Sequence, residues 1–378
     1  MSVLLKKLFK SAVLITAWFG LSSPNLAQPY EEFTLTEIEQ FEAPWALEFL
    51  PDDRILLSEM RGALKLLDSD GSLLGDISGV PEVSYGGQGG FGDIVLHPDF
   101  DENQMLYLSY AEAGSGGVSG AVVARARLEL GASSGELHDV EVIWRQTPKV
   151  TGQGHFGHRI LFGPDGYLWI SSGERQKFDP AQDMESNLGK LVRLNHDGSP
   201  AANNPFPSQN SVTSEIWSLG HRNPLGIDFD EQGRLWNIEM GPAGGDELNL
   251  VRRGANYGYP IVSDGDHYNG NDIPDHITDH TFSPPEIVWS PVISPSSMIF
   301  YDGDEFPHWK GNALVSGLSS MALVRIEFDG DSAWEAERFE MGRRIREVAQ
   351  GPDGAIWLLE DGRDGRGGRG YLLKLTAP

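Results

Sequence analysis

One short pattern recurs along almost the whole chain: a turn rich in Pro, Asp and Gly, followed by a short apolar strand. Pro-Asp and Asp-Gly pairs form turns because their backbone dihedral preferences suit turn positions. Self-similar units in one sequence indicate a repeat architecture in which neighbouring units bury a shared core. The turns, two of them weaker copies, are residues 50–53, 97–99, 163–166, 230–233, 309–312 and 351–354.

A second strand follows most of these turns and alternates in character, as in Val122–Leu128 and Leu191–Leu194. Such alternation is typical of half-buried antiparallel strands. Short strands and little helical periodicity predict an all-β protein, a six-bladed β-propeller formed by residues 28–378 as a single domain. A strand at Phe33–Ile38 is expected to pair with the C-terminal strands and close the ring. We expect residues 263–295 to form loops on one face. A two-sheet sandwich is the alternative, but it does not need six similar turns.

The N-terminus has the pattern of a secretory signal peptide. Three lysines precede the apolar run Ser11–Leu21, which is too short to span a bilayer comfortably, and turn-forming residues lead to Ala27. We therefore expect residues 1–27 to be removed and the mature protein to be periplasmic or secreted, without stable membrane insertion. An uncleaved anchor is the alternative interpretation.

The composition restricts the partners and metals that the chain can bind. It has 55 acidic and 29 basic residues and a formal net charge of −26, so it repels nucleic acid and anionic membranes. It contains no cysteine, so a metal site must use oxygen or imidazole ligands, and hard cations such as calcium suit the acidic composition. An anionic cofactor would need a local cluster of arginines and a metal ion.

Four glycine-rich polar segments depart from what a structural repeat requires: residues 86–90, 152–159, 220–224 and 241–247. Glycine clusters mark places where the backbone approaches something closely, and loops at strand ends often carry function. In the second segment, His155 can act as a base near neutral pH, and Glu174 could orient its imidazole. The alternative is a histidine whose nitrogens are satisfied by backbone carbonyls.

The third and fourth segments carry groups suited to an anion and to a hard cation. Arg222 presents a fixed fork of donors to a carboxylate or a developing oxyanion. The segment Gly241–Glu247 offers backbone carbonyls and the carboxylates of Asp246 and Glu247, which are ligands that calcium prefers. The alternatives are a surface or inter-blade ion pair for Arg222 and a solvated turn for the two carboxylates.

These segments, taken in their order along the chain, resemble those of the soluble pyrroloquinoline quinone (PQQ)-dependent glucose and aldose sugar dehydrogenase family. The resemblance runs from about Ala43 to the C-terminus and rests on residues 88–90, 96–100, 155–166, 215–226, 241–250 and 256–260. It implies PQQ and calcium as cofactors, a small-molecule aldose as substrate and an external electron acceptor. The implied reaction passes the C1 hydride of the aldose to the quinone and yields a lactone.

The resemblance also implies roles for single residues. His155 matches the catalytic base, and Arg222 and Asn223 match the pair beside the reactive carbonyl of the quinone. The other residues that match cofactor contacts are Gln88, Arg344 and Arg346, and the two arginines correspond to those that hold the cofactor carboxylates.

For calcium, the resemblance implies two sites. The backbone carbonyls of Gly241 and Pro242 match ligands of the ion that PQQ also coordinates. Glu247 and the carbonyl of Tyr257 resemble ligands of a second, structural calcium ion.

Three positions depart from the family pattern. Gly154 stands where an acid is usual, Ser319 where a lysine contacts the cofactor, and His158 where a small residue is usual. His158 therefore adds a rival base. Two other functions stay open: a calcium-dependent propeller lactonase, which would lack the arginine set, and a binding module that has lost PQQ.

Overall fold

The structure is a computed structural model that describes residues 33–208, 211–362 and 368–378. The expected signal peptide, residues 1–27, lies outside the described residues, and its cleavage stays a prediction. Among the helices of the described ranges, none is both long enough and apolar enough to cross a membrane.

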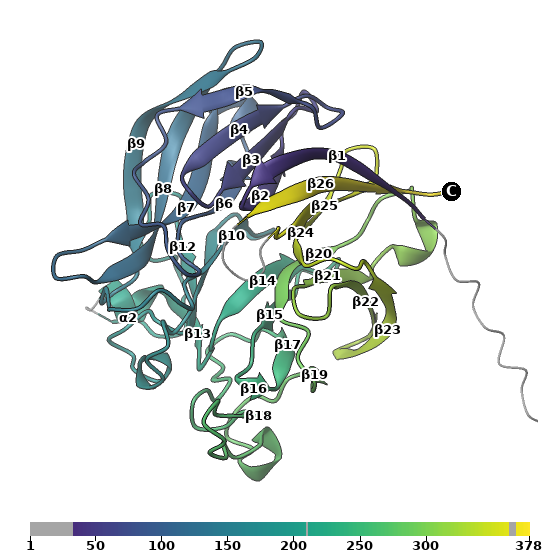
Figure 1. The fold of residues 1–378 in the computed structure, drawn as a ribbon. Helices are drawn as coiled ribbons and strands as arrows, with labels where there is room; N and C mark the ends of the chain where they lie inside the picture. The colour runs from purple at the N-terminus through teal and green to yellow at the C-terminus, as the bar shows by residue number, and fades with distance from the viewer. Residues whose placement is uncertain (1–32, 209–210, 363–367) are drawn as a thin grey trace, which may run out of the picture. The chain divides into compact units, whose positions relative to one another are not determined.

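Six four-stranded units account for most of the described chain and form the blades of a propeller (Figure 1). Blade 1 consists of β2 (Pro44–Phe49), β3 (Ile55–Glu59), β4 (Ala63–Leu67) and β5 (Leu73–Ser78). Blade 2 consists of β6 (Phe91–Leu96), β7 (Met105–Ala113), β8 (Ser119–Leu130) and β9 (Gly135–Arg145). Blade 3 consists of β10 (Gly157–Phe162), β11 (Leu168–Ser172), β12 (Lys190–Leu194) and β13 (Ile216–Leu219).

The remaining blades follow in chain order. Blade 4 consists of β14 (Pro224–Phe229), β15 (Leu235–Glu239), β17 (Asp246–Leu250) and β19 (Ile287–Trp289). Blade 5 consists of β20 (Pro295–Phe300), β21 (Ala313–Gly317), β22 (Ala322–Asp329) and β23 (Ser332–Glu340). Blade 6 consists of β24 (Ile345–Gln350), β25 (Ile356–Glu360), β26 (Arg369–Thr376) and β1 (Thr34–Glu42).

Short elements complete the described chain. They are α1 (Phe100–Asn103), α2 (Ser211–Glu215), the hairpin of β16 (Ala243–Gly244) with β18 (Gly265–Asp266), and the 3₁₀ turns Asp179–Ala181, His276–Thr278 and Pro307–Trp309.

The innermost strands of the six blades share one design. In each of them, four buried residues precede two half-buried ones, and the register with the next strand shifts near the first residue. These strands contact one another in cyclic order, and the last, β24, returns to β2. The predicted six-bladed propeller is therefore confirmed, and the alternative of a two-sheet sandwich is excluded.

The ring is closed by the N-terminal strand, as the sequence predicts. Strand β1 pairs antiparallel with β26, with Leu35 opposite Leu375. The strand runs from Thr34 to Glu42 and is longer than the predicted Phe33–Ile38. Blades 1 and 2 are joined by a short parallel contact between Ile77 and Gly135, so their eight strands form one sheet.

In the recurring turns, an acidic side chain binds the strand that follows the turn. In blade 4, Asp230 accepts a hydrogen bond from the indole N–H of Trp236 at 2.9 Å. In blade 3, Asp165 accepts one from Trp169 at 3.2 Å. The repeat of an acidic turn residue and an aromatic strand residue therefore has a structural cause.

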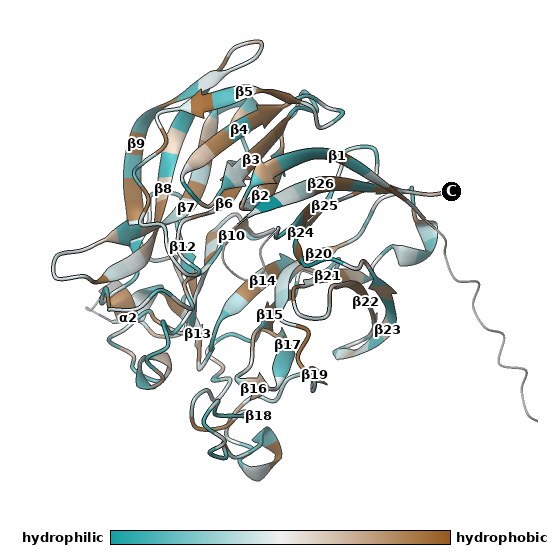
Figure 2. Cartoon of the chain, viewed as in Figure 1, coloured by the Kyte–Doolittle hydropathy of each residue, from teal (hydrophilic) through white to brown (hydrophobic). Residues whose placement is uncertain are grey.

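The core lies between neighbouring blades. For example, Leu47 and Leu57 of blade 1 pack with Trp357 and Leu359 of blade 6 in one buried cluster. In Figure 2 the hydrophobic segments lie mainly along the strands of the blades. Burial of apolar side chains between every pair of neighbours holds the ring together.

The segment 263–295 was expected to form only loops. It also contains the outer strand of blade 4, β19, the short strand β18, the 3₁₀ turn His276–Thr278 and the first residue of β20, so the expectation is wrong for these residues. A strand of three residues with one polar neighbour on each side is too short to show a periodic pattern.

Candidate active site

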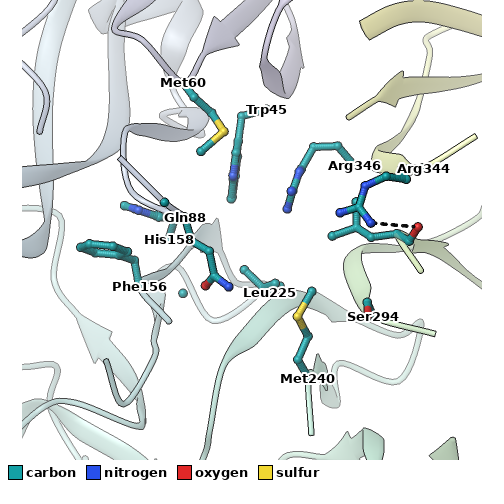
Figure 3. Close-up of a pocket in the computed structure, with 13 residues that line it drawn as sticks. Trp45, Met60, Gln88, Phe156, His158, Leu225, Met240, Ser294, Arg344 and Arg346 are labelled. Carbon is teal, nitrogen blue, oxygen red and sulfur yellow. Dashed lines mark hydrogen bonds between the residues drawn. The ribbon is translucent and has the colours of Figure 1, made fainter. Parts of the chain in front are cut away.

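Two cavities lie where the innermost strands begin. The first, of about 290 Å³, is lined by Trp45, Met60, Gly87, Gln88, Phe156, Gly157, His158, Leu225, Met240, Ser294, Leu318, Arg344 and Arg346 (Figure 3). The second, of about 260 Å³, is lined by His155, Glu174, Gln176, Phe178, Arg222, Pro242, Tyr259, His267, Tyr268 and Asn269. The segments 155–158 and 240–242 contribute to both cavities.

The first cavity holds the predicted pair of C-terminal arginines. The buried carboxylate of Asp361 accepts from Arg344 Nε and from Arg346 Nη2, each at 2.9 Å. Arg346 also donates to the hydroxyl of Ser296 at 2.9 Å. The shared carboxylate holds both guanidinium groups at the wall of the first cavity, where they can also face an anionic ligand.

Gln88 connects the first cavity to the predicted base. Its side-chain oxygen accepts the backbone N–H of His155 at 2.7 Å. Its own backbone N–H donates to the carbonyl of Gln153 at 2.7 Å. The loop that carries Gln88 therefore positions the segment that carries His155.

The second cavity brings His155 and Glu174 together. Nδ1 of the imidazole contacts one oxygen of the Glu174 carboxylate. The other oxygen accepts the backbone N–H groups of Lys177 at 2.5 Å and Phe178 at 2.7 Å. The prediction that Glu174 orients His155 is therefore consistent with their contact, and the alternative of a histidine held only by backbone carbonyls is excluded for Nδ1.

Burial and neighbouring charges set the protonation of this pair. Burial lowers the pKa of His155 below its ordinary value, the bond to Glu174 opposes this shift, and the charge of Arg222 adds to it. Burial opposes ionisation of Glu174, but the bond to His155 and nearby positive charge lower its pKa overall. A neutral imidazole beside an ionised carboxylate is the form that a general base needs.

Arg222 is held from three sides. Its backbone N–H donates to Glu239 at 2.6 Å, Nη1 donates to the carbonyl of Met240 at 2.8 Å, and Nη2 donates to the hydroxyl of Tyr268 at 3.2 Å. Among the described residues, its buried Nε has no partner. The same holds for the buried amide nitrogen of Asn223. Two unmatched donors on adjacent residues fit an oxygen-bearing ligand.

The expected calcium segment is a tight and buried turn. The Gly241 N–H donates to Asp246 at 2.8 Å, and a Cβ at Gly241 would lie 2.1 Å from the carbonyl oxygen of Gly245. Burial raises the pKa of Asp246 to about 6. Asp246 and Glu247 are both buried, so a solvated turn is excluded. Pro242 borders the second cavity, which places the Gly241–Pro242 segment beside His155 and Arg222.

Comparisons with known proteins identify the family of this chain. A family model described as glucose/sorbosone dehydrogenase matches residues 41–374. The chain belongs to the glucose/sorbosone dehydrogenase family. Within this family, the chain is 38% identical over 345 residues to aldose sugar dehydrogenase YliI of Escherichia coli. The aligned region covers 89% of this chain and 91% of the relative.

Solved structures of sugar dehydrogenases have the same fold. The soluble aldose sugar dehydrogenase of Escherichia coli in its apo-form matches with a TM-score of 0.85 and 36% identity, over 92% of this chain and 100% of that one. The PQQ-bound aldose sugar dehydrogenase of Streptomyces coelicolor matches with a TM-score of 0.75 and 30% identity, over 92% and 99%. The predicted family resemblance is confirmed.

The three departures from the family pattern lie in different surroundings. The ring of His158 stacks on Phe156 with centroids 5.3 Å apart, and burial lowers its pKa to about 3. A buried wall residue of this kind is a poor rival to His155 as a base. Ser319 is exposed and donates to the carbonyl of Val292 at 3.2 Å. At Gly154, a Cβ would lie 2.6 Å from the side chain of Gln176.

Some residues of the site were not predicted from the sequence. Asp361 bridges the two arginines, Tyr268 meets Arg222, and Trp45 lines the first cavity. Each comes from a loop or strand start of a different blade, and the residues around it in the sequence do not indicate its partner. Only the ring closure brings them to the same place.

Proposed function

We propose that the chain is a PQQ- and calcium-dependent oxidoreductase that oxidises aldoses at C1 to lactones. The observation that carries this proposal is the arrangement of a His155–Glu174 pair and Arg222 at one cavity with two bridged arginines at the adjacent one. The arginine set argues against a propeller lactonase, which does not need to hold a tricarboxylate.

The donors around the cavities suit PQQ, an aromatic tricarboxylate with an ortho-quinone. Arg344 and Arg346 would hold its carboxylates by charge-assisted hydrogen bonds, and Gln88 would contact it from the opposite loop. Arg222 and Asn223 would direct donors to the quinone side. When bound, PQQ supplies an acceptor for a hydride from the sugar, so the difficult redox chemistry belongs to the cofactor.

His155 would remove the proton from the anomeric hydroxyl of the aldose. Since Nδ1 is engaged by Glu174, Nε2 is the nitrogen that remains for this proton. Glu174 keeps the imidazole in one orientation and stabilises it after it gains the proton. The sugar thereby loses a proton and a hydride and leaves as a lactone.

Arg222 would stabilise negative charge that develops beside it in the transition state. Its side chain is held by Met240 and Tyr268, so little reorganisation is needed during the reaction. The carbonyls of Gly241 and Pro242 would hold a calcium ion that adds positive charge at the same end of the site.

Two proposals concern the surroundings of the enzyme. The signal pattern of residues 1–27 supports export to the periplasm or beyond. An external electron acceptor must then take the electrons after each turnover, because a bound quinone is used again only once it is reoxidised.

Direct binding of the cofactor tests the proposal without any assay of activity. Calorimetric titration of PQQ into chelator-treated mature protein should show saturable binding in the presence of calcium and much weaker binding in its absence. Absence of PQQ binding at saturating calcium would overturn the proposal and favour the binding-module interpretation.

A further inference from the structure

An arginine that the proposed mechanism does not use binds the loop that carries His155. Arg175 is completely buried. Its guanidinium donates to three backbone carbonyls: Nε to Gly154 at 2.8 Å, Nη1 to Ser119 at 2.6 Å and Nη2 to Gly152 at 2.6 Å. Nη2 also lies 3.4 Å from the Ser119 hydroxyl. The fixed fork of one arginine thus holds several carbonyl oxygens in place.

This cation has no carboxylate partner of its own. Among the described residues Arg175 forms no ion pair, and the carboxylate of the adjacent Glu174 already contacts His155. Burial lowers the pKa of Arg175 to about 10, so the group is still charged at neutral pH. A buried charge is costly unless its partners compensate it. The guanidinium and the carbonyls around it therefore constrain one another.

The loop that Arg175 binds carries His155 in a strained backbone conformation. His155 has a φ of 50° and Arg175 a φ of 62°, in the left-handed region that non-glycine residues seldom adopt. The backbone N–H of Arg175 donates to the carbonyl of His155 at 3.2 Å. A Cβ at Gly173 would lie 2.3 Å from that same carbonyl oxygen, so the two segments are in close contact. Such conformations persist only where surrounding contacts fix them.

Arg175 also reaches the first cavity, through Phe156. Its guanidinium carbon lies 3.6 Å from the centroid of the Phe156 ring. That ring stacks on His158 with centroids 5.3 Å apart, and both residues line the first cavity (Figure 3). A cation over an aromatic face is attracted to it, and more strongly where water is excluded. One side chain thus contacts the loop of the base and the wall of the adjacent cavity.

We propose that Arg175 is a positioning residue that holds the backbone of His155 and the ring of Phe156 at fixed places. Arg175 is not among the residues that line either cavity, so it acts through the loop and not on a bound molecule. The inference rests on the proposed function, because only there is His155 a base. Displacement of a reacting group by about 1 Å can cost about 10²-fold in rate.

Two substitutions separate the charge of Arg175 from its fork of donors. Arg175→Met keeps an apolar side chain against Phe156 but donates no hydrogen bond. Arg175→Lys keeps the charge but not the planar fork. In the loaded enzyme we expect kcat to fall by about 10²-fold in Arg175→Met with little change in KM, and to fall less in Arg175→Lys.

Arg193 is the matched control for loss of a buried arginine. Its guanidinium carbon lies 3.8 Å from the centroid of Tyr167, and it donates to Asp165 and to the carbonyl of Ala202, away from both cavities. Arg193→Met should lower the melting temperature and leave kcat unchanged. A fall in kcat that follows the melting temperature in both variants would show that Arg175 acts only on stability.

Hydrogen exchange of the unloaded protein tests the loop contacts without the cofactor. Exchange is read by mass spectrometry on peptides that contain residues 152–156 and, as reference, β15 of blade 4. In Arg175→Met we expect the loop amides to exchange about tenfold faster or more, because hydrogen bonds from a charged group are lost. The amides of β15 should be unchanged.

Several results would overturn the inference. One is a normal kcat in Arg175→Met, and another is unchanged exchange of its 152–156 loop. If Arg175→Met does not fold, Arg175→Lys decides, and normal kcat with normal exchange in that variant would show that the fork is dispensable. If the wild type has no dehydrogenase activity, the proposed function fails, and exchange in the unloaded protein still shows whether Arg175 holds the loop.

Discussion

His155 and Glu174 form a buried pair in which a single carboxylate serves two purposes. One of its oxygens contacts Nδ1 of the imidazole, and the other accepts the backbone N–H groups of Lys177 and Phe178. The carboxylate therefore holds the base and also the loop that forms one wall of the second cavity. Loss of this side chain should affect both the proton transfer and the shape of the site.

Glu174→Gln should lower kcat and shift its pH dependence. In the wild type, burial already lowers the pKa of His155, and the bond to Glu174 opposes that shift. The glutamine cannot stabilise the imidazolium, so the pKa of His155 should fall further. The acidic limb of the kcat–pH profile should move to lower pH, while the plateau falls by about 10- to 100-fold because the base is weaker. A limb that stays in place, or moves to higher pH, would show that Glu174 does not act on His155.

Substitution of the two neighbouring histidines should distinguish the base from the wall residue. His155→Ala should reduce kcat by about 10²- to 10⁴-fold, the usual contribution of a general base. His158→Gly should keep most of kcat, because glycine adopts the positive φ of 86° at this position and the ring of His158 is buried against Phe156. If His155→Ala kept a normal kcat and His158→Gly lost it, His158 and not His155 would be the base.

Arg344→Ala and Arg346→Ala should weaken the binding of PQQ. Each removes hydrogen bonds to a charged group, worth about 1.5–3 kcal/mol, which corresponds to roughly a 10- to 150-fold rise in Kd. Arg343→Ala is the matched control, because Arg343 pairs with Glu37 at 2.7 Å and does not line the cavity. Calorimetric titration of PQQ measures all three. Equal losses for Arg343→Ala and the other two would show that the effect is only one of net charge.

Asp230→Ala should destabilise the fold. Asp230 accepts bonds from the Trp236 indole at 2.9 Å and the Arg234 guanidinium at 2.6 Å, and the alanine variant would leave a buried donor unpaired. We expect a loss of about 1–3 kcal/mol in the free energy of unfolding. Asp70, an exposed turn aspartate whose side chain accepts hydrogen bonds from Ser72, is the control, and Asp70→Ala should leave the free energy of unfolding nearly unchanged. Denaturant unfolding gives both values, and similar losses would contradict this role of the turn.

The sequence predicted the blades well because their determinants are local. The acidic turn residue and the aromatic strand residue that bind each other, such as Asp230 and Trp236, are six positions apart. The His155–Glu174 pair was predicted for a related reason, since both residues belong to the first hairpin of blade 3 and its flanking loops.

The residues that were missed depend on which loops meet at the mouth of the ring. Ser296 reaches Arg346 from blade 5, and His276 reaches Tyr257 from an insertion without periodic pattern, whereas Asp361 reaches Arg346 across the β24–β25 hairpin of blade 6. Their neighbours in the sequence give no signal of these contacts. The partners from other blades are decided by ring closure and loop packing, and that of Asp361 by the register of one hairpin.

The most direct test of the central claim is reconstitution of the mature protein with PQQ and calcium, followed by reduction of a dye acceptor by a panel of aldoses. The account predicts dye reduction that requires both additions, that is abolished when EDTA precedes loading, and that converts the aldose to its lactone. Absence of dye reduction with every aldose, despite stoichiometric binding of PQQ, would contradict the claim that this chain is an aldose dehydrogenase.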